Sequence, residues 1–182
     1  RMARDTFFLR GQIVTDDANQ DRDESTIDLG AFVNLGSTKP QVLRIHSIQM
    51  QVCDSIGLPP TVDASGSVGE ERTAFLAAAI TTKSTDLAIT AMPQLNDDEV
   101  IFTSSVNVTN GRNSVDNGST SSALDIAPQH LVNGMLVGVD TLYLYAISDD
   151  AFAEDVNVNF LLECSTEPIS KENAVSLALS QS

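Results

Sequence analysis

Five oxygen-bearing side chains near the N-terminus have the spacing of a calcium-binding loop. They occupy the first, third, fifth, seventh and last positions of one loop-sized window, namely Asp17, Asn19, Asp21, Asp23 and Asp28. Calcium takes oxygen ligands at this spacing in helix-loop-helix sites. However, Arg22 stands where such a loop requires glycine, and Asp28 stands where it requires a longer, bidentate glutamate. The pattern therefore predicts either a calcium site or a solvated acidic turn between two strands, and these departures favour the turn.

Residues suited to catalysis are sparse. The two histidines, His46 and His130, are isolated, so the sequence lacks the His-x-His pair of a cupin-type metal site. No Gly-x-Ser-x-Gly turn is present, and Gly30 and Gly36 belong to no phosphate-binding or dinucleotide-binding motif. A Ser/His/Asp triad needs only to meet in space, but the pattern favours His46 as a hydrogen-bonded polar residue at a strand irregularity. We expect that the chain is not an enzyme and has no cofactor other than the calcium considered above.

Two cysteines, Cys53 and Cys164, permit one internal disulfide. The alternation of residues 155–164 places Cys164 on the apolar face of that segment, whereas Cys53 lies on the face opposite to Met50. Two reduced or buried thiols are therefore favoured over a disulfide.

Charge is the strongest compositional feature. The 182 residues include 25 acidic and 10 basic ones, for a formal net charge of −15. Nucleic-acid binders use clustered Lys and Arg to release counterions from phosphates, so direct binding of nucleic acid is not expected. An acidic surface poor in Lys is typical of proteins that work in high salt, where repulsion is screened. No apolar run approaches the roughly 18 residues of a membrane-spanning helix, which predicts a soluble or peripheral protein.

Eight strand-like stretches separated by turn-rich breaks define the predicted architecture. They are 5–15, 25–35, 41–54, 73–83, 86–92, 99–109, 132–148 and 155–166. Their number and spacing predict an all-β fold, an antiparallel eight-stranded jelly-roll sandwich with a short C-terminal helix. The alanine-rich segment 70–80 also suits a short helix, and this alternative stays open. Two stretches rich in small residues, 57–69 and 110–122, are predicted to be long loops.

Three of the stretches carry more detailed predictions. Residues 155–164 alternate, which predicts a strand whose inner face consists of Val156, Val158, Phe160 and Leu162. Toward the end of 138–147, apolar residues occupy both faces of the predicted strand, which predicts a central position in the sheet. In 41–54 the apolar residues change from one face of the predicted strand to the other near His46, which predicts a β-bulge there.

A helix is predicted after the last strand. Ser170 can cap a helix over 171–179, in which Val175, Ala178 and Leu179 form an apolar stripe. We predict that these three side chains contact a neighbouring subunit; packing of the stripe on the helix's own sheet is the alternative.

Length and composition indicate one domain. The whole chain, 1–182, is expected to be a single jelly-roll domain, with an N-terminal arm at 1–4 and a helix and tail at 170–182.

Together, the eight stretches, the long loops, the acidic surface and the capped C-terminal helix resemble a small single jelly-roll major capsid protein. The similarity is to icosahedral viruses of archaea or bacteria in saline water, several of which enclose a membrane. It covers the chain from Asp5 to Ser182 as a pattern without an identifying motif. The resemblance implies a structural shell subunit that self-assembles into a virus particle and is located in the virion. It implies homo-oligomers and other coat proteins as partners, with a possible peripheral contact to an internal membrane.

The main alternative is an extracellular carbohydrate-binding or adhesion module of the same β-sandwich type. Glycan binders stack sugars on exposed Trp or Tyr. The chain has no Trp, and its two tyrosines, Tyr143 and Tyr145, fall within an apolar strand. A shell subunit is therefore favoured over a binding module, and both are favoured over an enzyme.

Overall fold

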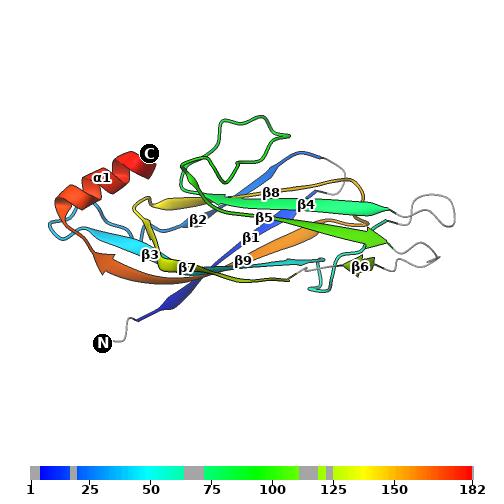
Figure 1. Cartoon of the computed structure of the whole chain (residues 1–182), viewed down its shortest axis with the longest axis horizontal. Coiled ribbons are helices and arrows are strands. Elements are labelled where there is room, and N and C mark those ends of the chain that lie inside the picture. Colours follow the sequence, from blue (N-terminus) through cyan, green and yellow to red (C-terminus); the bar gives the residue numbers. More distant parts are fainter. Residues whose placement is uncertain (1–4, 17–19, 64–71, 111–118, 122–124, 182) are drawn as a thin grey trace.

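The computed structural model describes residues 5–16, 20–63, 72–110, 119–121 and 125–181. Figure 1 shows two stacked sheets with a helix beside one end of them. No helix in these residues is long and apolar enough to cross a membrane. The elements of this part of the chain are β1 (Phe7–Thr15), β2 (Asp23–Asp28), β3 (Gln41–Cys53), β4 (Thr73–Thr81), β5 (Val100–Asn110), β6 (Ser119–Ser121), β7 (Asp125–Val137), β8 (Thr141–Ser148), β9 (Val156–Pro168) and α1 (Lys171–Gln181).

The strand order is that of a jelly roll. One sheet has the order β1-β9-β3-β7, and the other has the order β2-β8-β4-β5-β6. The antiparallel partners are nested along the chain, since β4 pairs with β5, β3 with β7, β2 with β8 and β1 with β9. A long antiparallel ribbon that is folded at its middle and then rolled up gives this nesting. The predicted all-β jelly-roll class is confirmed, and the short β6 extends one sheet at its edge.

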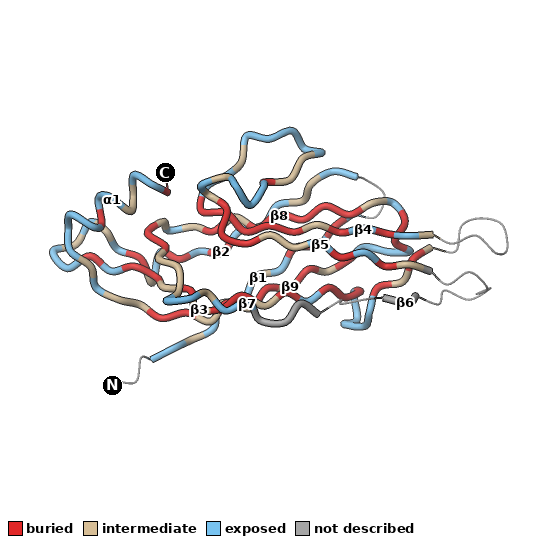
Figure 2. The backbone as a smooth tube through the Cα atoms, in the orientation of Figure 1, coloured by how far each residue is buried: buried red, intermediate tan, exposed pale blue. Residues whose placement is uncertain are grey.

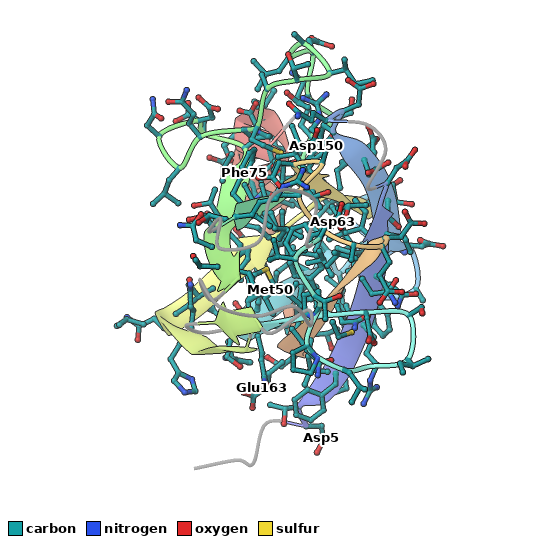
Figure 3. All side chains as sticks on the ribbon, turned by 90° about the vertical axis from the view of Figure 1, so that its right-hand side faces the viewer. Asp5, Met50, Asp63, Phe75, Asp150 and Glu163 are labelled. Carbon is teal, nitrogen blue, oxygen red and sulfur yellow. The ribbon has the colours of Figure 1, made fainter. Side chains whose placement is uncertain are left out.

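The core lies between the two sheets, because alternate side chains of each strand face inward. Figure 2 shows buried backbone along the strands of both sheets, and Figure 3 shows Met50 in the interior. Phe102 of β5 meets Phe160 of β9 edge to face, with ring centroids 6.0 Å apart. Such an aromatic pair adds about 0.5–1.5 kcal/mol beyond the burial of its area and here joins the two sheets. The predicted inner residues of β9 are all at most 2% exposed: Val156, Val158, Phe160 and Leu162.

The predicted bulge in β3 is present. The register of β3 with both of its neighbours shifts between Ile45 and Ser47. A bulge changes the side-chain phase by one residue, so Ile45 before it and Ile48 after it both point into the core and are buried. The predicted central position of the strand over 138–147 is also confirmed, because β8 lies between β2 and β4.

Two of the strand predictions are wrong. Residues 86–92 form no strand and belong to the connection 82–99 between β4 and β5. The segment connects two strands that pair directly with each other, and Arg22 binds its carbonyl groups in place of a neighbouring strand. The stretch 132–148 belongs to two strands, β7 and β8, which are separated at 138–140. The apolar Val139 within this turn makes the turn hard to recognise from the sequence.

The alanine-rich segment forms a strand, so the helical alternative for 70–80 is wrong for the residues described. Thr73 to Thr81 form β4, which pairs with β5 on one side and β8 on the other. Pairing on both sides and burial of one face override the helix propensity of alanine. The predicted stretch 25–35 is a strand only as far as Asp28. Both segments predicted as long loops fall partly outside the described residues.

The two cysteines are buried and form no disulfide with each other, as expected. Cys164 lies opposite Ile45 on β3, whereas Cys53 lies opposite Asn157. Along β3, Ile45 and Cys53 are about 26 Å apart, so the two cysteines are too far from each other for a disulfide. Burial raises the pKa of the Cys164 thiol to about 12, with a smaller contribution from the charge of Glu163. This thiol stays protonated and unreactive at neutral pH.

The connection 82–99 is fastened to the outer face of the second sheet by Arg22 and Tyr145. Figure 1 shows it standing out beside β5 and β8. The Arg22 guanidinium lies 5.1 Å from the centroid of the Tyr145 ring, and the Tyr145 hydroxyl accepts a hydrogen bond of 3.0 Å from the Thr85 N–H. The same guanidinium donates to three carbonyl oxygens of the connection, those of Ala91 at 2.5 Å, Ala88 at 3.0 Å and Leu87 at 3.3 Å.

Replacing Arg22 by Ala should release the connection 82–99, because three backbone carbonyls lose their shared donor. We expect a loss of about 1–2 kcal/mol in the free energy of unfolding and faster protease cleavage within 82–99. Arg22→Lys is the matched control, because an ammonium keeps the charge but cannot span three carbonyls, and it should fall between the native chain and Arg22→Ala. Native-like cleavage rates in Arg22→Ala would contradict this role.

Candidate subunit interface

The helix α1 begins where the sequence predicts. The Ser170 hydroxyl accepts a hydrogen bond from the Asn173 N–H at 3.2 Å, and the Ser170 carbonyl accepts one from the Ala174 N–H at 2.9 Å. This is the geometry of an N-terminal cap. Glu172 in the first turn is also favourable, because the N-terminal end of a helix carries partial positive charge.

One face of α1 packs on its own subunit. Ala174 is buried, and Leu177, one turn later, is half-buried. A Cβ atom added to Gly138 would lie 2.8 Å from Leu177 Cδ2, so a larger residue there would displace the Leu177 side chain from the end of β7. The helix therefore packs on its own subunit through Ala174 and Leu177, which are not residues of the predicted stripe.

Gln181 fixes the C-terminal end of the same face. Its side chain is 8% exposed. Its Oε1 accepts a hydrogen bond of 2.8 Å from the Gly138 N–H, and its Nε2 donates one of 2.9 Å to the Leu136 carbonyl. The amide therefore pairs with the backbone at the end of β7 as a neighbouring strand would, which satisfies groups that burial would otherwise leave without partners. No pattern in the sequence singles out Gln181, because its role depends on where the helix ends in space.

The outer face of α1 is apolar and open to solvent. Val175 is 61% exposed and Leu179 is 74% exposed. Residues four apart lie on one side of a helix, so these two side chains form one surface, with the half-buried Ala178 beside it. A hollow of about 580 Å³ borders this surface, with Met135, Leu179 and Lys83 among its lining residues. The structure thus presents two of the three predicted contact residues outward, and their contact with another subunit stays a prediction.

The residues of the predicted calcium loop are only partly brought together. Asp17 and Asn19 lie outside the described residues. Asp23 and Asp28 lie at opposite ends of β2, about 17 Å apart, so they cannot share one ion. The Asp28 carboxylate instead accepts the Gly30 N–H at 2.8 Å. No three acidic, His or Cys side chains of the described residues form a group that could hold a metal. Asp28 is therefore a wrong choice as a ligand beside Asp23, and calcium at the rest of the loop stays a prediction.

Asp23 lies among other carboxylates. Desolvation by burial raises the pKa of Asp23, and the negative charges of Asp16, Asp155 and Asp21 raise it further. A hydrogen bond of 3.2 Å from the Asp16 N–H to Asp23 Oδ2 opposes these effects only in part. The ionised carboxylate is thus less favourable in the folded chain than in the unfolded one.

The residues considered for catalysis or sugar binding do not form such a site in the described part of the chain. His46 Nε2 lies 2.7 Å from Ser165 Oγ, but Ser165 is 3% exposed and closed to a substrate. His130 lies exposed on β7, opposite Ser47. Tyr145 is fully buried and Tyr143 is half-buried, so neither offers an open ring to a sugar.

Comparison of the sequence with known proteins gives no relative. No protein-family model matches the chain, and no curated protein matches it.

Two solved structures are similar to the chain. VP1 of Trichodysplasia spinulosa-associated polyomavirus, in complex with GM1 oligosaccharide, is similar with a TM-score of 0.50 and 11% sequence identity, over 90% of this chain and 96% of that chain. Apo VP1 of chimpanzee polyomavirus is similar with a TM-score of 0.47 and 9% identity, over 91% of this chain and 96% of that chain. At such low identity, the first of these similarities shows the jelly-roll fold alone. The function has to be inferred from the surface of this chain.

Gln181→Ala should detach the C-terminal end of α1 and leave the sandwich folded, because the strands do not depend on this amide. We expect faster hydrogen exchange in 174–181 and little change in β9. Gln181→Glu is the matched control, since it keeps one acceptor for the Gly138 N–H but lacks the donor to Leu136. Exchange in α1 that does not change in Gln181→Ala would show that the amide does not hold the helix.

Asp23→Asn should raise the melting temperature at neutral pH. A raised carboxyl pKa means that the stability contribution of Asp23 is present at low pH and is lost as the pH rises through the folded-state pKa. Removing the charge while keeping an oxygen for the Asp16 N–H should therefore stabilise the chain at about pH 7 and have little effect at about pH 3, where Asp23 is protonated in both states. Asp28→Asn is the control. A melting temperature lowered at neutral pH would contradict the assignment.

The same variant tests the calcium prediction. If calcium binds at Asp21 and Asp23, adding calcium at constant ionic strength raises the melting temperature of the native chain by mass action, and Asp23→Asn loses that response. Equal melting temperatures with calcium and with chelator would show that this turn is only an acidic surface.

Proposed function

We propose that the chain is a structural subunit of a viral shell and assembles with copies of itself. The observation that carries the proposal is the exposed apolar surface of α1, formed by Val175 and Leu179. The opposite face of this short helix already packs on its own subunit, while the outer pair stays largely exposed. An apolar pair held outward on a fixed element is suited to contact with another molecule.

The fold supports a shell. Jelly rolls build viral capsids as well as lectins, and polyomavirus VP1, which shares the fold, is a viral protein. The alternative function as a glycan-binding module has less support, because both tyrosines lie in the strands with little or no exposure. A virus of archaea or bacteria in saline water, further coat proteins and contact with an internal membrane stay predictions from the composition and the resemblance.

Charge sets the conditions for assembly. Subunits with a net charge of −15 repel one another, and this repulsion is screened over about 10 Å at 0.1 M salt and over about 3 Å at 1 M. Buried apolar contacts must supply the attraction. We therefore expect assembly to need salt.

Replacing Val175 and Leu179 together by Asp should impair assembly and leave the fold intact. Burial of each apolar side chain in a contact contributes roughly 1.5 kcal/mol or more to the free energy of association. Losing both side chains should therefore raise the protein concentration needed for assembly at least tenfold. Light scattering and native mass spectrometry at low and high salt measure this. The matched control is the pair Asn173→Asp and Ser176→Asp, which adds the same charge to exposed polar positions of α1. If native and doubly substituted chains form particles equally well, α1 is not an assembly contact. A native chain that stays monomeric at high salt would reject the shell function itself.

A further inference from the structure

Two long strand edges of the described chain are unprotected: that of β1, and that of β5 over 100–107, since the short β6 pairs only with the end of β5. Natural proteins protect exposed edges by short strands, charge, proline or bulges, because free N–H and C=O groups pair with other chains. β2 is six residues long and carries Asp23, Glu24 and Asp28, and β6 has three residues. β7 contains Pro128, and its register is broken near Asn133 and Gly134, which both have positive φ.

β1 has none of these devices. It is nine residues long, contains no proline, and pairs with β9 in unbroken register over its whole length. Its other side forms no backbone ladder with the described residues. Alternate residues of the strand leave about four N–H and four C=O groups directed away from β9. Arg10 is its one charged residue.

The outer face beside this edge is close to neutral, although the chain is strongly acidic. Phe8 and Val14 of β1 are 52% and 47% exposed there. Gln12 Nε2 donates to Asn159 Oδ1 at 2.9 Å, and Asn159 is followed across the sheet by Gln51. A hollow of about 560 Å³ on this face has no acidic residue in its lining. Copies that repel one another elsewhere can therefore approach here.

We propose that β1 pairs antiparallel with β1 of a second copy across a twofold axis at Gly11, which joins the two sheets into one. This inference rests on the proposed function, since it takes another copy as the occupant. In this register Phe8 lies opposite Val14 of the second copy, and Arg10 lies opposite Gln12. Each exposed apolar side chain gains an apolar partner across the new pair. A shift of the axis to Arg10 would place two arginines opposite each other, and a shift to Gln12 would leave Phe8 without a partner.

Two substitutions of one residue test the register. Gln12→Arg places an arginine opposite Arg10 of the second copy, twice by symmetry, and should weaken dimerisation about tenfold. Gln12→Glu places a carboxylate opposite each Arg10 and should strengthen it. General repulsion predicts the reverse order, because Gln12→Arg lowers the net negative charge and Gln12→Glu increases it. Sedimentation equilibrium at fixed salt, with melting curves to confirm folding, separates the two. An order that follows net charge would overturn the proposal.

Cross-linking tests the same pairing directly. Chains with Arg10→Cys mixed with chains with Gln12→Cys should form mixed disulfide dimers under oxidation, because the two positions lie opposite each other, while each variant alone should cross-link less. Equal cross-linking in mixed and separate samples would overturn the proposal. If that result came with normal particle formation, the β1 pair would be wrong and the shell function would stand. A native chain that is monomeric in all conditions would reject both.

Discussion

The structure depends on the burial of one face of each sheet against the other. β9 is the strand through which this burial determines the position of several other elements. A strand with one buried face cannot slip by one residue without exposing its whole apolar set. β9 therefore fixes the register of β1 along nine consecutive pairs and that of β3 on its other side. Through Phe160 it also contacts the opposite sheet. The outward face of β1 and the start of α1, which follows β9 directly, are both set by this one strand.

The irregular segments are held by single side chains that satisfy several backbone groups. Arg22 binds carbonyls of the connection 82–99, and Gln181 binds the end of β7. Arg44 donates to the Asn133 carbonyl at the bulge of β7 and to both oxygens of Glu167, and Asp54 accepts N–H groups of the turn that follows β3. Buried or half-buried loops need such partners because their backbone has no ladder. The loops are thus attached at a few points, whereas the sheets are held along their whole length.

The parts of the fold that follow from local pattern could be predicted from the sequence, and the parts that depend on distant partners could not. Period-two alternation identified β9, and the phase shift at His46 identified the bulge, because both are written into neighbouring residues. The segment 86–92 alternates in the same way, yet it forms no strand, since the distant Arg22 and not a neighbouring strand binds its carbonyl groups. The candidate interface shows the same division. The apolar pair Val175 and Leu179 is visible in the helical spacing, whereas the attachment through Gln181 depends on the distant turn at Gly138.

The symmetry of the contacts bears on how a shell can form. A twofold pair of identical edges closes at a dimer, because each copy uses its β1 once. A closed shell therefore requires at least one contact of a different kind, and the outer face of α1 is an exposed apolar surface suited to it. The two contacts also differ in chemistry, because the β1 edge relies on backbone hydrogen bonds and α1 relies on apolar burial. Because salt screens the repulsion between acidic subunits at both contacts, both should strengthen as the salt concentration rises.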